Sequence, residues 1–416
     1  MQSPSIPPTR AALSARALVT LCALNHAALT GSRVAVSLSA LAMGVSTFQT
    51  GLLLAVYALL PTLGSVWLGR WVDRAGARVP ALVGMGMICI GLMLPTWQMA
   101  PSTLWLTVAL VGGGYASAVL AFQHELVRRA NSMGRANGLS DFALATAMSS
   151  SLGPLVAGHC IALGGTRLTF ALLASVGLVA GIGATLRRGG FDCRGGRRAE
   201  SPHGRLSVSQ VLDDPVLRRI FVVDLLLAIA WNANSFIVPI YGTQHDWSAA
   251  EVGNMLAVFG GAVLLVRALA ALRLKRLDEW WTIRFALVSS GVCFLLLPFA
   301  GRLPFAFVLE FMMGIGLGGA LPNVLVLLHA QSPAGRDGEV LGLRLVALNI
   351  SAIVLPMCLG ALGACLGMAS VMWTLGASLS FGAIRCARGP RLSFQPVTGH
   401  RDGDKDSALE METPSR

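Results

Sequence analysis

The sequence is short of charge, and of acidic residues most of all. Only 12% of its 416 residues are Asp, Glu, Lys or Arg, and 20 acidic residues stand against 32 basic ones. A chain that is 54% apolar and carries so little charge lies outside the composition range of soluble globular proteins. This composition excludes an ordinary water-soluble domain and predicts a protein whose solvent is the lipid bilayer.

Motifs for metals, nucleotides and covalent catalysis are missing too. The eight cysteines are scattered without C-x-x-C spacing or neighbouring His ligands, and we interpret them as small apolar residues of helices. Neither a G-x-x-x-x-G-K-[ST] loop nor an H-E-x-x-H pair occurs. We therefore expect no cofactor, no metal site, no ATP-driven pumping and no enzyme. A membrane-embedded enzyme or a receptor without transport is the alternative class, and it would need a catalytic cluster or a large soluble module.

Long apolar runs are what the sequence has in abundance. A helix needs about 20 apolar residues to cross roughly 30 Å of hydrocarbon, and we find twelve such runs. The expected fold class is an all-α membrane protein whose twelve transmembrane helices form two pseudo-symmetric bundles. The expected units are an N-tail (1–16), a six-helix bundle (17–187), a central linker (188–218), a second six-helix bundle (219–386) and a C-tail (387–416).

The placement of the basic residues decides what the formal net charge of +12 means. Most Lys and Arg fall in the tails and in every second loop, and only Arg167 and Arg302 fall in the intervening loops. The positive-inside rule requires this alternation, whereas a nucleic-acid surface does not. We expect no nucleic-acid partner and a monomeric, multi-pass protein with both termini in the cytosol. The preference for Arg over Lys favours a bacterial plasma (inner) membrane.

A short basic turn, GRWVDRAGAR at residues 69–78, separates the second and third apolar runs. Ionisable groups beside a membrane are costly unless they have partners, which indicates a use for this turn. The turn resembles the signature G-x-x-x-D-R/K-x-G-R/K-R/K of the major facilitator superfamily of secondary transporters. Ala77 is the only departure, and the matching residues are Gly69, Asp73, Arg74, Gly76 and Arg78. Twelve runs in two sixes extend the resemblance over nearly the whole chain.

The resemblance implies a conformational role for this turn. Asp73 would dock against the start of the eleventh helix, whose free N–H groups and positive dipole end suit a carboxylate. Glu125, at the end of the fourth run, is placed to accept Arg74 or Arg78. Both contacts can form only while the cytosolic side is closed. Because Lys275 stands where Asp73 would recur after the eighth helix, we expect this latch to be one-sided.

A second resemblance lies in the fifth run. Proton-driven exporters of the superfamily carry G-x-x-x-G-P-x-x-G-G there, and this chain reads SSSLGPLVAG with Gly153, Pro154 and Gly158 in place. A related Pro-x-x-x-Gly, residues 356–360, recurs in the eleventh run. Small residues let helices approach closely and Pro frees a carbonyl, so plain helix packing is the alternative role. The motif favours export, although the Arg that the family places in the fourth run is missing.

Ionisable side chains within the runs are functional candidates because each is costly at membrane depth. Glu310 is a candidate for proton coupling, since burial favours a carboxyl group that holds its proton. Its alternative is an interfacial carboxylate that faces water or pairs with a neighbour. Asp224 is a second such candidate. We expect it to pair with Arg267 or Arg344, either as a gate or as a static bridge. Candidates for contact with an amphiphilic substrate are Asn25, His26, Tyr57, Trp231, Asn232 and Asn234.

Taken together, these features predict a secondary active transporter. We expect an antiporter that exports small amphiphilic molecules, such as drugs, metabolites or siderophore-like chelators, by alternating access in exchange for protons. Its expected partners are the small-molecule substrate, protons and the lipid bilayer. Import of a small nutrient is the alternative, because the basic turn does not distinguish the direction of transport.

Overall fold

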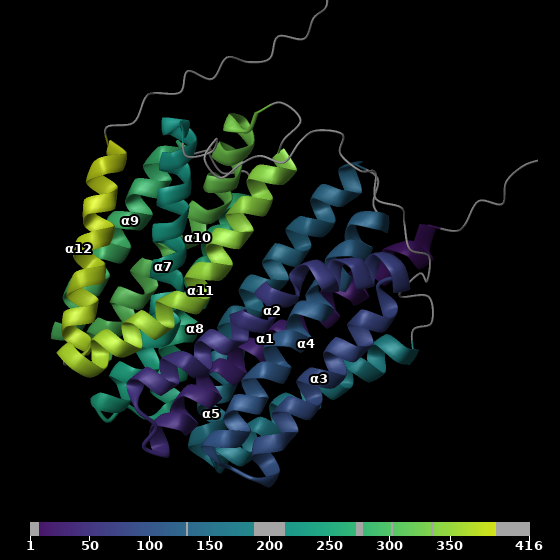
Figure 1. The fold of residues 1–416 in the computed structure, drawn as a ribbon, viewed down its shortest axis with the longest axis horizontal. Helices are drawn as coiled ribbons and strands as arrows, with labels where there is room; N and C mark the ends of the chain where they lie inside the picture. The colour runs from purple at the N-terminus through teal and green to yellow at the C-terminus, as the bar shows by residue number, and fades with distance from the viewer. Residues whose placement is uncertain are drawn as a thin grey trace, which may run out of the picture.

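The structure is a computed structural model that describes residues 8–129, 132–186, 213–271, 278–300, 303–333 and 337–387 (Figure 1). Among these residues there are helices and no β-strand. The first half, here called the N-half, contains α1 (Pro8–Ala42), α2 (Thr47–Ala75), α3 (Arg78–Trp97), α4 (Pro101–Arg129) and α5 (Ser132–Leu186). The second, the C-half, contains α7 (Pro215–Gln244), α8 (Ala249–Ala271), α9 (Glu279–Leu296), η1 (Leu297–Phe299), α10 (Leu303–Gln331), α11 (Asp337–Leu366) and α12 (Met368–Ala387).

Capping side chains set where several helices begin. Ser46 accepts a hydrogen bond from the backbone N–H of Gln49 at 3.3 Å, at the start of α2. Asp278 accepts from the N–H of Trp281 at 2.7 Å, at the start of α9. Each bond satisfies one of the N–H groups that a first helical turn leaves unpaired.

Two helices begin before the expected bundles do. Helix α1 begins at Pro8, so residues 8–16 of the expected N-tail are helical. Helix α7 begins at Pro215, inside the expected linker, because Asp214 accepts from two backbone N–H groups and Pro215 suits the first helical turn. Residues 1–7, 188–212 and 388–416 of the expected linker and tails lie outside the described residues, so the division into units stays a prediction.

The expected fifth and sixth helices form one element, α5, which is broken at a glycine. Gly165 has φ 76° and ψ 178° inside this element. A positive φ of this size is open to Gly at little cost and strained for other residues. The break divides α5 into a first arm before Gly165 and a second arm after it.

The second arm folds back along the first. Gly153 in the first arm and Leu173 in the second both lie beside Gly31 of α1, whereas Gly183 lies beside Leu21, earlier in α1. The second arm therefore runs back toward the start of α1, as the separate fifth and sixth helices were expected to do. We call the end of the molecule at Gly165 the hairpin end, and the opposite end, which carries residues 69–78, the turn end.

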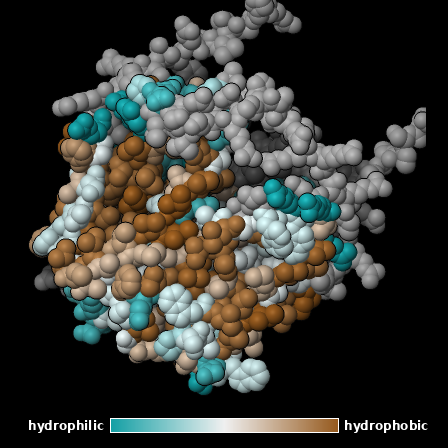
Figure 2. Space-filling view, in the orientation of Figure 1, coloured by the Kyte–Doolittle hydropathy of each residue, from teal (hydrophilic) through white to brown (hydrophobic). Residues whose placement is uncertain are grey.

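Nine helical segments in the described part of the chain are long and apolar enough to cross a membrane. The segment in α5 is 43 residues long because both arms are counted together, and α1 and α12 are not among the nine. Apolar residues cover the broad middle of the visible face, and hydrophilic residues gather toward its ends (Figure 2). The all-α membrane fold is confirmed, and the number of twelve spans stays a prediction.

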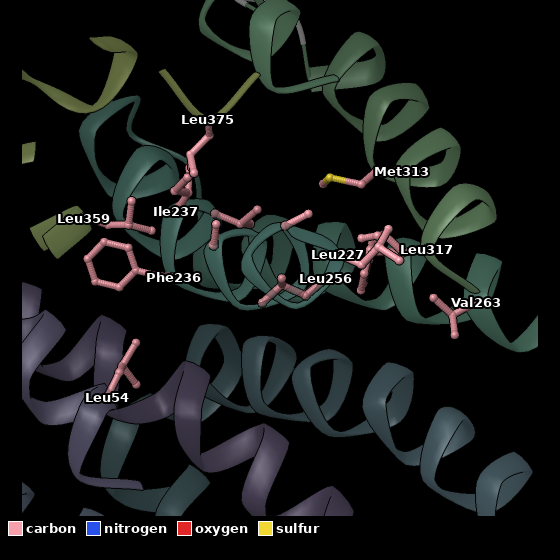
Figure 3. Close-up of a cluster of buried hydrophobic side chains, with 14 of the residues drawn as sticks. Leu54, Leu227, Phe236, Ile237, Leu256, Val263, Met313, Leu317, Leu359 and Leu375 are labelled. Carbon is pink, nitrogen blue, oxygen red and sulfur yellow. The ribbon is translucent and has the colours of Figure 1, made fainter. Parts of the chain in front are cut away.

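One buried apolar cluster is shared by the two halves, and a second belongs to the N-half alone. The larger buried cluster includes residues of both halves, and within it Leu359 and Leu375 lie beside Phe236 and Ile237 in the C-half (Figure 3). A second cluster lies near the turn end and consists of N-half residues alone, among them Val72 and the fully buried Phe122. Figure 1 shows the helices of the two halves diverging toward that end.

Candidate functional site

The two halves touch through two matched glycine crossings. At the first, α5 crosses α8: a Cβ built on Gly253 would lie 2.7 Å from the Pro154 carbonyl oxygen and 2.9 Å from Gly158 Cα. These distances leave no space for a side chain, so the two backbones are in direct contact. Pro154 and Gly158 of the predicted motif therefore face the other half of the molecule. Gly153 faces α1 instead, where its Cβ would meet the Ala27 carbonyl oxygen at 2.7 Å.

At the second crossing, α2 meets α11 in the same manner. A Cβ on Gly51 would collide with the carbonyl oxygen of Pro356, and a Cβ on Gly360 would lie 2.9 Å from the Thr47 carbonyl oxygen. The Pro-x-x-x-Gly pattern of each half thus packs on a glycine of the other half. Both crossings lie toward the hairpin end.

Side-chain hydrogen bonds reinforce the crossing of α5 and α8. Ser151 Oγ donates to the Ala257 carbonyl oxygen at 2.7 Å. His159 Nε2 lies 2.9 Å from Asn254 Oδ1. Interhelical bonds of this kind add specificity to packing that is otherwise set by small residues.

The turn end has a different character. A Cβ built on Gly69 of α2, or on Gly342 of α11, would find nothing within 4 Å. Neither glycine is therefore covered by another helix, although the same helices touch at the hairpin end. The halves are in contact at the hairpin end, and their helices diverge toward the turn end (Figure 1).

The residues of the basic turn lie where α2 ends. Gly76 has φ 73° and caps α2, which explains the need for glycine there. Arg74 is exposed, Arg78 is partly buried, and Glu125 is fully buried. The Asp73 side chain and Lys275 lie outside the described residues, so the docking of Asp73 on α11 and the pairing of Glu125 with either arginine stay predictions.

An ion pair links α7 to α11 near the turn end. Arg344 Nη2 donates to Asp224 Oδ1 at 3.0 Å, and Arg344 Nε lies 2.8 Å from Asp224 Oδ2. The first contact is a well-aligned hydrogen bond, whereas the second is an ionic contact without hydrogen-bond geometry. Both side chains belong to the C-half and are mostly buried. The pair therefore braces one bundle and does not bridge the two halves in this state.

Arg267, the other partner considered for Asp224, lies elsewhere. Its Nη1 donates to the Ala143 carbonyl oxygen of α5 at 3.2 Å, so it reaches from the C-half into the N-half. Its Nε is buried and has no hydrogen-bond partner. Position along a helix did not separate Arg267 from Arg344, because the rotation of each helix decides which way its side chains point.

Glu310 is buried in the C-half, where it is hydrogen-bonded to a neighbour. Its Oε2 accepts a hydrogen bond from Asn234 Nδ2 at 2.9 Å, and both side chains have 0% exposure. Among the residues that the structure describes, Glu310 Oε1 and Asn234 Oδ1 have no hydrogen-bond partner. The structure thus joins two residues that the sequence offered for different roles, one for proton coupling and one for substrate contact.

The N-half carries a group of polar side chains on α1 that contact aromatic rings of α2 and α4. Arg33 Cζ lies 5.7 Å from the centre of the Tyr57 ring, whose hydroxyl is 3.0 Å from Ser32 Oγ. The His26 and Tyr115 rings are 5.6 Å apart. Arg33 is one of the ionisable side chains within the apolar runs that were functional candidates, beside His26 and Tyr57, whereas sequence reasoning did not name Tyr115.

The remaining candidates make more local contacts. Asn25 donates to the Leu21 carbonyl oxygen at 2.8 Å, and Asn232 to that of Ala228 at 3.0 Å, one turn earlier in their own helices. Trp231 packs edge-on against Phe259 of α8, with ring centres 5.0 Å apart. Within the described residues, no group of three or more His, Cys, Asp or Glu side chains is placed to hold a metal ion.

Comparison with known proteins identifies relatives of this chain. A family model described as the Major Facilitator Superfamily matches residues 18–356 and also 220–393. The class C tetracycline resistance protein of Escherichia coli is 25% identical over 344 residues, which cover 79% of this chain and 84% of that protein. The class G tetracycline resistance protein of Vibrio anguillarum is 27% identical over 150 residues, which cover 35% of this chain and only 38% of that protein. The solved structure of a POT family transporter in complex with 5-aminolevulinic acid has a TM-score of 0.75 at 13% identity, covering 90% of this chain and 95% of that one, and it shares the fold.

Proposed function

Because the chain belongs to the major facilitator superfamily, we propose that this transporter exports small amphiphilic molecules by alternating access in exchange for protons. We place it in a bacterial inner membrane with both termini in the cytosol, so that the turn end faces the cytosol. Two tetracycline resistance proteins among its relatives support export. The likeness to the POT structure concerns the fold and does not bear on direction.

One observation carries the proposal: the halves touch through the two glycine crossings at the hairpin end and diverge toward the turn end (Figure 1). In alternating access, two pseudo-symmetric bundles rock about a central site. Backbone contacts without intervening side chains let two helices pivot over one another, because no interdigitated side chain must be withdrawn. Gly253 with Pro154, and Gly51 with Pro356, are the two points about which we expect the rocking to occur.

Glu310 is the group that we assign to proton coupling. An ionisable side chain inside a membrane protein is costly and is a functional candidate for that reason. Glu310 has one oxygen held by Asn234 and one oxygen without a partner, so the second is free to carry a proton. Asp224 is the weaker candidate, because both of its oxygens already face Arg344.

The test uses everted membrane vesicles that contain the full chain. We expect accumulation of some members of a panel of amphiphilic dyes and chelators, and we expect a protonophore to abolish it. Glu310→Gln should lose this uphill accumulation and keep downhill exchange. Glu251→Gln is the matched control, because Glu251 is a carboxylate at the start of α8 that only caps its own helix at Ser248.

Two results would contradict the proposal. Uphill accumulation by Glu310→Gln at the wild-type rate would exclude Glu310 as the coupling group. If no compound of the panel accumulates in wild-type vesicles, and the same panel enters right-side-out vesicles along the proton gradient, the protein is an importer.

A further inference from the structure

The interface between the halves carries basic groups that no carboxylate balances. Arg33 of α1, which lies over the Tyr57 ring, and Arg267 of α8, which reaches α5, are two such groups. Within the described residues, neither arginine forms an ion pair with a carboxylate, whereas Arg344 has Asp224 as its partner. Positive charge at membrane depth is costly unless something compensates it.

His26 and Arg267 come from different halves and meet on α5. The His26 ring lies against the backbone of Thr146, and Arg267 Nη1 donates to the Ala143 carbonyl oxygen at 3.2 Å. Ala143 and Thr146 are three residues apart, which is less than one helical turn. The two basic side chains are therefore neighbours at the seam between the halves.

Arg33 extends this group along α1. It follows His26 by seven residues, which returns to the same face of a helix two turns later. Aromatic rings accompany both residues, Tyr115 beside His26 and Tyr57 beneath Arg33. This face of α1 thus carries His26 and Arg33 and lies against aromatic rings of α2 and α4.

One N–H donor of this group is buried and unpaired. Within the described residues, Arg267 Nε has no hydrogen-bond partner. Buried polar atoms nearly always have partners, and an unpaired one in a native structure calls for a reason. A ligand with acceptor oxygens would supply the missing partner and the missing negative charge together.

We propose that Arg33 and Arg267 bind the carboxylate of an organic anion, whose apolar body packs against the His26, Tyr57 and Tyr115 rings. Hydrogen bonds from arginine to a carboxylate are about twice as strong as neutral ones. The ligand would contact both halves, because Arg267 belongs to the C-half and Arg33 to the N-half. This inference rests on the proposed function and narrows its substrate class to amphiphilic acids.

The test is equilibrium binding to the purified full chain in lipid nanodiscs, with three probes of one shape. The probes are 1-naphthoate, 1-naphthylmethanol and 1-naphthylmethylammonium, which carry negative, zero and positive charge on the same ring system. We expect 1-naphthoate to bind at least about tenfold more tightly than the other two, as a charge-assisted hydrogen bond provides. Arg33→Gln and Arg267→Gln should each weaken 1-naphthoate binding by about tenfold and leave 1-naphthylmethanol binding unchanged.

Two variants serve as controls. Arg33→Lys keeps the charge and should recover part of the affinity. Arg385→Gln removes an arginine that also lies over an aromatic ring, with Cζ 5.1 Å from the Phe381 ring centre, but on α12 away from the interface. It should bind 1-naphthoate like the wild type. Elution of each variant as a single symmetric peak in size-exclusion chromatography shows that it is folded.

Equal binding of the three probes, or wild-type 1-naphthoate affinity in folded Arg33→Gln and Arg267→Gln, would overturn the proposal. The vesicle assay separates this failure from failure of the proposed function. Proton-driven export of neutral or cationic dyes without 1-naphthoate binding would refute the anion site and leave export standing. Charge-selective 1-naphthoate binding without export of any compound would support the site and refute the exporter.

Discussion

Two adjacent glycines of α8 offer a direct test of the crossing between α5 and α8. A Cβ on Gly260 would lie 2.8 Å from both the N and the Cα of Ser151, whereas a Cβ on Gly261 would meet only Ser151 Oγ, at 3.8 Å. The first distance requires a backbone to move, and the second is ordinary van der Waals contact. Gly260→Ala should therefore push α8 away from α5, and Gly261→Ala should not.

The expected magnitude follows from the size of the clash. Adding a methyl group to a tightly packed contact costs about 1 to 3 kcal/mol. The gain in helix propensity from Gly to Ala, about 1 kcal/mol, applies to both variants and to both conformations of the transporter, so it cancels from the conformational equilibrium. Gly260→Ala should therefore shift the population away from the state seen here by about 5- to 150-fold.

The assay measures how readily the hairpin end opens. A single cysteine at Ala249, the first residue of α8, is introduced into a chain whose eight native cysteines have been replaced. The rate of reaction with a membrane-impermeant maleimide then reports exposure of that end. We expect a rate increase with Gly260→Ala and no increase with Gly261→Ala. Equal rates in the two variants would refute the idea that this crossing holds the hairpin end closed.

Two smaller perturbations follow from the same contacts. Ser151→Ala removes the hydrogen bond to the Ala257 carbonyl oxygen. Because interhelical bonds in membranes are worth only about 0.6 kcal/mol, the rate of the maleimide reaction should change by at most about threefold. A rate change as large as that of Gly260→Ala would contradict this ranking. Asp224→Asn leaves Arg344 buried without its counter-ion and should cost about 3 kcal/mol, seen as loss of the folded fraction after mild heating of purified protein. Adding Arg344→Gln should restore stability, and a double variant no better than the single one would show that the pair does not brace the C-half.

Part of this fold is visible in composition and spacing alone. Apolar runs predict helices in a bilayer because the backbone must satisfy its own hydrogen bonds there, and no other element does so within one segment. The reversal at Gly165 was expected between two runs, and it sits at a glycine because only that residue takes a positive φ without strain. The start of α7 was missed, although the cap at Asp214 and the proline that follows it are a local signal.

The candidate site was predicted as separate residues and not as an arrangement. Glu310 and Asn234 are 76 positions apart, and nothing local indicates that one donates a hydrogen bond to the other. Asp224 had two basic residues to choose between, and the rotation of α8 turns Arg267 toward α5 instead. The grouping of Arg267 with His26 and Arg33 was not foreseen, since it depends on α1 and α8 both packing on α5.

The sequence by itself determined that the protein lies in a lipid bilayer, and it determined the class of fold, the family and the positions where helices can approach one another closely. These properties depend on the order of residues within single segments, where hydropathy, glycine and proline act locally. Only the tertiary structure decided which end is closed, which charges are paired and which are left without a counter-ion. These properties depend on the rotation and tilt of each helix against its neighbours, and the unbalanced charge of Arg33 and Arg267 exists only because α1 and α8 both pack on α5.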